Sequence, residues 1–313
     1  MDWNSDYIAG LIARALAEDI GSGDVTVAAT IPASATATAR IIAKQDLVCA
    51  GLPIAESVFR RLDPHLNVRL HATDGQDVKN GQELLHLSGK AAAILTGERT
   101  ALNFLGHLSG VATLTHKFVE AIAGTHVRIR DTRKATPGLR LLEKYAVRMG
   151  GGTNHRAGLY DAILLKENHI ALAGGVKAAL DQAHAYASSQ MNSHTMTAYE
   201  AAGSEAGTAA SQPAQQSLTI QIEVRDETEL REALSAGAQS ILLDNMTPDE
   251  ARRCVAIIRG IRTNAIVELS GGITLENVRA YALTGADYLS SGALTHSARA
   301  ADLSLLVDSI RGK

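Results

Sequence analysis

The 313-residue sequence lacks the features that support several common classes of protein. Its two cysteines, Cys49 and Cys254, stand in apolar surroundings without CxxC spacing, so neither a disulfide framework nor a zinc site is indicated. No apolar run approaches the roughly 18 residues that a membrane span requires, and the first six residues lack the basic start of a signal peptide. The sequence therefore predicts no membrane partner and, by default, a cytoplasmic location.

Several enzyme signatures are also missing from the sequence. It shows no Ser-His-Asp arrangement, HExxH motif, Walker motif or dinucleotide-binding fingerprint. The sequence therefore contains none of the usual motifs of hydrolases, metalloproteases, NTPases or dinucleotide-dependent redox enzymes. Aromatic residues make up only 4% of the chain, which suits a core of branched aliphatic side chains such as that of a β/α barrel.

The charge of the chain is mildly negative overall but locally positive. A net charge of −3 at pH 7 argues against a nucleic-acid-binding surface. Residues 128–177 nevertheless hold ten Lys or Arg against four Asp or Glu. This local excess of cations indicates a pocket for an anion.

The length of the chain predicts one large α/β barrel with a smaller appendage. We place the appendage in residues 1–113, where apolar residues from Ile8 to Leu16 recur at helical spacing. Strands are expected from there to about Ser88, because Asp74-Gly75 and Asn80-Gly81 are hairpin turn signals. A long amphipathic helix from about residue 90 to residue 115 should link this domain to the rest.

Residues 114–313 repeat one pattern: a short apolar run, polar residues at its carboxyl end, and then a helical stretch. The six runs are 127–130, 162–165, 218–222, 240–243, 265–267 and 288–289. In a parallel β/α barrel the carboxyl ends of the strands converge on one face. The polar residues that follow the runs should therefore share one pocket.

Cations from three segments meet in this predicted pocket. They are Arg133, Lys134, Arg156 and Lys166, with His155 beside them. Guanidinium groups grip carboxylates with two parallel hydrogen bonds, and lysine supplies a point charge. The group indicates a binding site for a small polyanion; the alternative for each cation alone is a solvated surface position.

Two glycine turns follow the late strands of the predicted barrel. Ser270-Gly271-Gly272 and Ser291-Gly292 could present backbone N–H groups to a phosphate. Paired turns of this kind resemble the phosphate site common in such barrels. A plain tight turn remains the alternative for either one.

Two acidic residues, Glu223 and Asp244, close adjacent predicted strands that face the basic pocket. Binding of a Mg²⁺ ion that carries pyrophosphate is one reason for their position, since Mg²⁺ prefers one or two carboxylates plus substrate oxygens. Ion pairs with Lys166 or Arg156 are the other. The spacing alone favours neither.

Residues 187–216 interrupt the repeating pattern. They are rich in Ala, Ser, Thr, Gly and Gln and hold almost no large apolar side chains. Such a composition cannot bury much apolar surface. We expect a flexible surface insertion with no catalytic role.

The sequence resembles the nicotinate-nucleotide pyrophosphorylase family, also called quinolinate phosphoribosyltransferases, over nearly its whole length. The motifs that carry the resemblance are residues 15–24, 97–103, 131–140, 143–147, 154–161, 243–246, 270–273 and 293–297. The resemblance implies a sandwich-like N-terminal domain and an open β/α barrel with fewer than eight strands. It also implies a homodimer, or a higher oligomer, whose active sites are shared between subunits.

The implied reaction joins quinolinate to the ribose of phosphoribosyl pyrophosphate, with loss of pyrophosphate and CO₂ and with Mg²⁺ as cofactor. By this resemblance Arg99 serves the pocket of the neighbouring chain. The other residues that match family positions are the following. Quinolinate is held by Arg133, His155, Arg156 and Lys166, with Lys134 beside them, ribose and Mg²⁺ lie near Glu223 and Asp244, and phosphate binds at Ser270, Gly271, Gly272 and Gly292. Lys166, Glu223 and Asp244 are the implied catalytic residues.

The sequence departs from the family pattern at two of these strands. Gln221 stands where the family often has the first of two alternating acids, and Leu269 replaces a usual Ala. Three other functions stay open at this point. They are a Schiff-base lyase that uses Lys166 as nucleophile, a related barrel enzyme acting on another aromatic acid or linked to molybdate metabolism, and a protein that only binds small anions.

Overall fold

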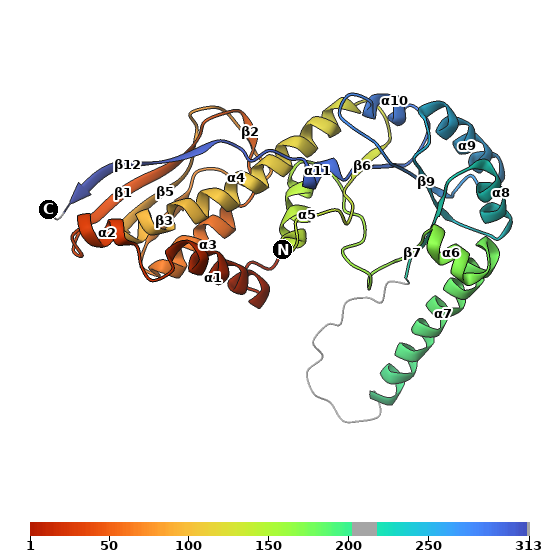
Figure 1. Ribbon diagram of the computed structural model, residues 1–313, viewed down its shortest axis with the longest axis horizontal. Helices are drawn as coiled ribbons and strands as arrows, with labels where there is room; N and C mark the ends of the chain where they lie inside the picture. The colour runs from red at the N-terminus through yellow and green to blue at the C-terminus, as the bar shows by residue number, and fades with distance from the viewer. Residues whose placement is uncertain (202–217, 312–313) are drawn as a thin grey trace. The chain divides into compact units, whose positions relative to one another are not determined.

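The computed structural model describes residues 1–201 and 218–311, with only the backbone of 191–201 considered. The chain divides into two compact units (Figure 1). The first unit comprises Met1–Ala121, Lys134–Asn154 and the segment from Gly292 onward, and the second comprises Ile122–Arg133 and His155–Ser291. Among the described residues, no helix has the length and apolar character needed to cross a membrane.

The first unit is built on a four-stranded antiparallel sheet of order β12-β1-β5-β3. Its elements are α1 (Asp6–Ile20), α2 (Val25–Thr30), β1 (Thr36–Ala43), β2 (Leu47–Val48), α3 (Leu52–Leu62), β3 (Asn67–Leu70), β4 (Asp77–Val78), β5 (Glu83–Lys90), α4 (Ala91–Ala121), α5 (Arg140–Met149), α11 (Ala293–His296) and β12 (Leu303–Arg311). Strand β1 alternates buried and less buried residues along its length. The alternation gives the sheet one face toward the core.

The end of the chain returns to the first unit beside the long helix α4. Ala301 donates its backbone N–H to the carbonyl oxygen of Gly106 at 2.8 Å. A Cβ atom on Gly110 would lie 2.1 Å from the carbonyl oxygen of Arg299, so only glycine allows this close approach. Strand β12 then pairs antiparallel with β1. The sequence pattern had assigned no strand to residues 303–311 and had placed the whole of 114–313 in the barrel domain.

The second unit is a parallel six-stranded sheet with helices along it (Figure 1). Its elements are β6 (Arg128–Arg130), β7 (Ile163–Leu165), α6 (Glu167–Ala173), α7 (Val176–Ala201), β8 (Ile220–Val224), α8 (Glu227–Ser235), β9 (Ser240–Asp244), α9 (Pro248–Ile261), β10 (Ile266–Ser270), α10 (Val278–Ala282) and β11 (Tyr288–Ser290). The strand order is β6-β11-β10-β9-β8-β7. The first strand of this unit, β6, therefore lies beside its last strand, β11, as in a barrel. Strands β6 and β7 form the two edges of the sheet and do not pair with each other, so the barrel is open. The predicted α/β class, with an open barrel and a separate small domain, is confirmed.

The two faces of the barrel sheet differ in polarity. One face carries buried aliphatic side chains, namely Ile129, Ile222, Val224, Ile241, Leu243, Val267, Leu269 and Leu289. Helices pack on this side, as α8 does on β8 and α10 on β11. Because side chains alternate along a strand, the other face carries mostly polar residues, namely Arg130, Gln221, Glu223, Asp244, Glu268, Ser270 and Ser290, with the apolar Leu242 among them. The interior of the open barrel is thus polar at the level where its chemistry is expected.

Three strand ends and one helix end differ from the sequence prediction. Glu223, Asp244 and Ser270 lie inside strands β8, β9 and β10 and not after them, because polar residues on the interior face need not end a strand. Residues 187–201 continue helix α7, where the composition had predicted the start of an irregular insertion; the Ala, Gln, Met and Glu residues of this stretch have high helix propensity. Residues 202–217 lie outside the described residues, and the flexibility expected of them stays a prediction.

Candidate active site

Strand register places four polar residues side by side at the carboxyl end of the barrel. Ser270 pairs with Asp244, and Ser290 pairs with Arg130. The pairing of Leu269 with Leu289 brings Ser270 and Ser290 onto neighbouring positions. The side chains of Ser290 and Arg130 contact Glu268 in the barrel interior. We call the group formed by Asp244, the turn 270–272, Arg133, Arg156, Lys166 and Glu223 the barrel mouth.

Arg133 and Arg156 carry the positive charge of the barrel mouth. Burial lowers the pKa of the Arg156 guanidinium, and the charge of Arg133 lowers it further, while Asp161 opposes the shift. The Nε atoms of both arginines are buried and have no hydrogen-bond partner within the described part of the chain. Two guanidinium groups that repel each other and keep unused donors are suited to a ligand with two carboxylates.

The loop that follows Arg156 is fixed by the carboxylate of Asp161. Its Oδ2 accepts the backbone N–H of Ala157 at 2.6 Å, and its Oδ1 accepts that of Gly158 at 2.9 Å. Arg156 itself donates from Nη1 to the carbonyl oxygen of Ala162 at 3.0 Å. The guanidinium is therefore positioned before any ligand binds, which reduces the entropy lost on binding.

Lys166 and Glu223 form an ion pair at the barrel mouth. The Lys166 side chain is 48% exposed and the Glu223 side chain 11% exposed. One of the two roles considered for Glu223, an ion pair with Lys166, is therefore present in the structure. An ammonium held by a carboxylate is a poor Schiff-base nucleophile, because that chemistry needs the neutral amine. The contact thus weakens the lyase alternative.

Asp244 and the turn 270–272 are joined through Asn245. Asn245 donates from Nδ2 to Asp244 Oδ2 at 2.6 Å, and its backbone N–H donates to the carbonyl oxygen of Ser270 at 2.9 Å. Its backbone adopts the left-handed conformation, with φ of 56°. At Gly271 φ is +94°, and a Cβ atom would lie 2.2 Å from Asn245 Oδ1. Gly271 is therefore required both for its positive φ and for the close approach of Asn245.

The second glycine turn is split between the two units. In the second unit Ser291 donates its buried hydroxyl to the carbonyl oxygen of Ile273 at 2.7 Å. In the first unit Gly292 precedes helix α11, and a Cβ atom there would lie 3.0 Å from Lys134 Cδ. The hydroxyl of Ser291 thus serves the fold, while Gly292 allows the Lys134 side chain to pass close to the backbone.

Arg99 lies in the first unit, on helix α4. Its side chain is exposed, and no hydrogen bond or ion pair of Arg99 is found among the described residues. It lines a pocket with Leu102, Asn103 and the segment 300–303. An unpaired, exposed arginine on a helix is available to a partner, as the resemblance implies.

The sequence reasoning gave no role to Glu268, which is fully buried in the barrel interior. It forms an ion pair with Arg130, in which Nη1 and Oε2 are 2.8 Å apart. Gln221 donates to it at 3.0 Å, and the hydroxyl of Ser290 also donates to it. An acidic residue between the apolar run 265–267 and Leu269 is the signal that could have revealed it.

The acids of the barrel mouth fit a magnesium ion held mainly by substrate oxygens. Within residues 1–190 and 218–311, no three His, Cys, Asp or Glu side chains are grouped so that they could hold a metal. Glu223 and Asp244 nonetheless face the same side of adjacent strands. One or two carboxylates are what Mg²⁺ takes from a protein when phosphate oxygens complete its shell.

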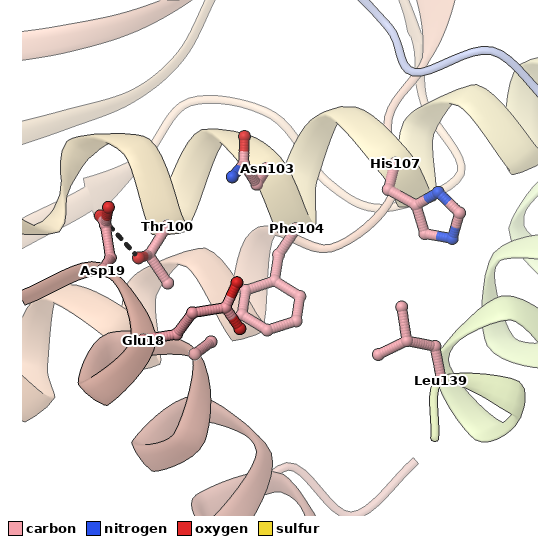
Figure 2. A pocket seen from close by; sticks show the side chains of 8 residues that line it. Glu18, Asp19, Thr100, Asn103, Phe104, His107 and Leu139 are labelled. Carbon is pink, nitrogen blue, oxygen red and sulfur yellow. Dashed lines mark hydrogen bonds between the residues drawn. The ribbon is translucent and has the colours of Figure 1, made fainter. Parts of the chain in front are cut away.

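A separate pocket lies within the first unit, between helices α1 and α4 (Figure 2). Glu18 and Asp19 face the side of α4 that carries Thr100, Asn103 and Phe104, and His107 points toward Leu139. Beneath it, His107 Nε2 lies 2.9 Å from Oε1 of the fully buried Glu143. The other oxygen of Glu143 accepts the backbone N–H of Thr136 at 3.0 Å. Glu143 thus anchors the loop that follows Lys134.

Replacement of Glu143 by Gln is expected to lower the free energy of unfolding by about 1.5 to 3 kcal/mol at pH 7, the range for hydrogen bonds to a charged group. Burial raises the pKa of Glu143, but hydrogen bonds from His107 and Thr136 outweigh burial and hold the pKa below its usual value. A lowered pKa stabilises the fold above the unfolded pKa, and this stability is lost as the pH falls through the folded pKa. The difference between the variant and the wild type should therefore shrink below about pH 4.5.

Urea unfolding at pH 7 and at pH 4 measures this difference. Glu120→Gln is the matched control, because Glu120 also faces a histidine, His116, but is exposed. Its replacement should change stability by less than about 0.5 kcal/mol. Equal stability of the two variants at pH 7 would show that Glu143 is not an anchor.

Comparison with known proteins gives consistent matches along the chain. The model of the quinolinate phosphoribosyl transferase N-terminal domain matches residues 24–109, and that of the C-terminal domain matches 111–201 and 191–306. A probable nicotinate-nucleotide pyrophosphorylase (carboxylating) of Bacillus subtilis is 40% identical over 92% of this chain and 89% of its own length. The corresponding Mycobacterium leprae protein is 40% identical over 97% and 98%.

A solved structure agrees with these sequence matches. The nicotinate-nucleotide pyrophosphorylase of Francisella tularensis superposes with a TM-score of 0.83 at 36% identity, covering 97% of this chain and 96% of that one. The similarity therefore extends over both units and not over the barrel alone.

Proposed function

The chain belongs to the quinolinate phosphoribosyltransferase family, and we propose that its barrel mouth performs the reaction of that family. The enzyme transfers the phosphoribosyl group of phosphoribosyl pyrophosphate to quinolinate and releases pyrophosphate and CO₂, which yields nicotinate mononucleotide for NAD biosynthesis. The observation that carries the assignment of residues is the pair Arg133 and Arg156, whose buried Nε donors have no partner in the described chain. Quinolinate offers two carboxylates to such a pair.

The bond-forming step needs no covalent enzyme intermediate. The pyridine nitrogen attacks the anomeric carbon of ribose, and pyrophosphate leaves as positive charge develops on the sugar. Asp244 accepts a hydrogen bond from a neutral amide, whereas Glu223 is already paired with Lys166. The negative charge of Asp244 is therefore not offset by the contact with Asn245, and Asp244 is the better placed of the two to stabilise positive charge on ribose.

Decarboxylation leaves negative charge on the pyridine ring at the carbon that loses CO₂. Arg133, Arg156 and Lys166 place three cations at the barrel mouth, and cations near that carbon stabilise the developing charge. The same cations orient the dicarboxylate, so positioning and charge stabilisation come from one set of side chains. The resemblance to the family adds Lys134 to the residues proposed to bind the substrate.

The leaving pyrophosphate is expected to carry Mg²⁺, which neutralises its charge. Glu223 and Asp244 are the carboxylates that would hold the ion with substrate oxygens. The turn 270–272, whose glycines have positive φ, supplies backbone N–H groups for the ribose phosphate. We further propose that the protein acts in the cytoplasm as a homodimer in which Arg99 reaches the barrel mouth of the partner.

An acceptor test distinguishes this function from the alternatives. Pyrophosphate release from phosphoribosyl pyrophosphate with Mg²⁺ is measured with quinolinate, with nicotinate and with no acceptor. We expect release only with quinolinate, in equal amount with CO₂. Nicotinate lacks one carboxylate, so it leaves one arginine unpaired, and its reaction should be at least about a hundredfold slower. Equal rates with nicotinate, or release without an acceptor, would contradict the proposal.

A further inference from the structure

A buried polar cluster lies in the barrel interior, below the cations of the barrel mouth. Its centre is Glu268 on β10, which contacts Arg130 on β6, Gln221 on β8 and Ser290 on β11. His155 lies at its edge, with Nε2 3.1 Å from Gln221 Oε1 and 3.6 Å from Glu268 Oε1. The reaction as described above uses neither Glu268 nor Gln221.

The charge of Glu268 determines which atom donates and which accepts in the hydrogen bonds of this cluster. A carboxylate ion-paired with Arg130 only accepts hydrogen bonds, so the Gln221 atom that faces it must be the Nε2 amide nitrogen, at 3.0 Å. The other end of the amide, Oε1, then faces His155 and also only accepts. His155 must therefore carry a proton on Nε2.

The second ring nitrogen of His155 has the opposite role. The backbone N–H of Arg156 donates to His155 Nδ1 at 2.7 Å, so Nδ1 must present a lone pair. With a proton on Nε2 and a lone pair on Nδ1, His155 is a neutral imidazole of one defined tautomer. Its ring then orients the backbone of Arg156, the residue whose side chain is offered to the substrate.

We propose that Glu268 is a positioning residue that acts through Gln221 to fix the Nε2–H tautomer of His155 and thereby the backbone of Arg156. The charge of a fully buried carboxylate sets the direction of the Gln221 amide, and the amide sets the tautomer. If Glu268 is neutral, the amide can rotate and present its NH₂ group to His155. The ring then favours a proton on Nδ1, which opposes the N–H of Arg156.

This inference rests on the proposed function for its kinetic effect but not for its structural one. Gln221→Met removes the link to His155 and keeps the contacts of Glu268 with Arg130 and Ser290. Glu268→Gln keeps the shape and removes the charge. Both should raise the quinolinate KM about tenfold, a change of about 1.4 kcal/mol, with kcat and the KM for phosphoribosyl pyrophosphate changed less than about twofold.

Ser290→Ala is the matched control, because it removes a partner of Glu268 that is not on the path to His155. Its quinolinate KM should stay within about twofold of the wild type. Thermal unfolding distinguishes Glu268→Gln from Gln221→Met. Glu268→Gln also breaks the ion pair with Arg130, so its Tm should fall, whereas the Tm of Gln221→Met should change little.

A spectroscopic readout tests the tautomer without any turnover. Selective ¹⁵N labelling of histidine, with His155 identified by loss of its signals in His155→Gln, reports which ring nitrogen is protonated. The wild type and Ser290→Ala should show His155 with Nε2 protonated and Nδ1 unprotonated. Gln221→Met and Glu268→Gln should lose this pattern. An unchanged tautomer in Gln221→Met, or an unchanged quinolinate KM in an active enzyme, would overturn the proposal. A wild type without quinolinate-dependent turnover would reject the proposed function alone, since the tautomer is read independently.

Discussion

Replacement of Gly271 by Ala is expected to lower kcat/KM for phosphoribosyl pyrophosphate by about a hundredfold or more, which corresponds to about 2.7 kcal/mol. Two effects act in the same direction. At φ of +94° a residue with a Cβ atom is strained. The added atom would also lie 2.2 Å from Asn245 Oδ1 and 2.6 Å from the Asn245 backbone nitrogen. Neither neighbour can be avoided by rotating a flexible side chain alone.

The consequence reaches Asp244 through Asn245. Displacing Asn245 removes the 2.6 Å hydrogen bond to the Asp244 carboxylate and the backbone bond to Ser270 at 2.9 Å. The turn 270–272 and the Asp244 carboxylate should therefore be displaced together, and the variant should use phosphoribosyl pyrophosphate less efficiently. Binding of quinolinate alone, measured by calorimetry, should change much less.

Gly237→Ala is the matched control for backbone strain. Its φ of +92° is nearly the same, but its nearest neighbour, Arg262 Nη2, lies at an ordinary contact distance of 3.7 Å. This variant should lose about 1 kcal/mol of stability and keep its activity. If Gly271→Ala behaves like Gly237→Ala, the turn at 270–272 is not part of the site.

Mixing two inactive variants should restore activity if active sites are shared between subunits. Arg99→Ala and Arg156→Ala should each reduce activity about a hundredfold or more, because each removes one partner of a charged substrate contact. A heterodimer of the two variants regains one intact site beside one doubly damaged site. Random mixing in equal amounts gives about half heterodimers, and so roughly a quarter of wild-type activity per subunit.

Unfolding, mixing and refolding of the two variants measures this recovery, with each variant refolded alone as control. The exposed position of Arg99 on α4, without a partner in the described chain, makes its loss neutral for the fold of its own unit. Both variants should therefore refold normally. Heterodimers that form but stay inactive would mean that Arg99 serves its own chain or none.

The sequence predicted correctly the elements that depend on patterns of neighbouring residues. Helix α1, the positions of the turns at Gly75 and Gly81, and most of α4 follow from side-chain periodicity and glycine position. The two turns were predicted to form hairpins, which is wrong, because β4 pairs with β2 and not with β3 or β5. The six barrel strands were also located, because each is a short apolar run between polar segments. Their ends were misplaced by one to three residues at β8, β9 and β10, since the interior face of this barrel is polar.

The assignments of site residues depend on different kinds of evidence. Arg133 and Lys166 followed from their positions after apolar runs, and Arg156 from its place in a turn that adjoins the predicted strands. The role of Arg99 came from resemblance alone, whereas Lys134 was placed in the predicted pocket by its position after a strand; both stay predictions. No pattern in the sequence identified Glu268 or the link through Gln221, because three of the residues involved, Arg130, Gln221 and Glu268, come from strands far apart in the chain.

By itself the sequence determined the α/β class, the order of the strands along the chain and the concentration of cations between residues 128 and 177. These depend on alternation and composition, which are properties of neighbouring residues. The tertiary structure alone decided that β12 joins the first unit, that Gly271 meets Asn245, and that Glu268 sets the polarity of His155. Each of these depends on which distant segments pack together. Burial of apolar surface, the main driving force of that packing, is non-directional, so the local apolar pattern of a segment does not specify its distant partner.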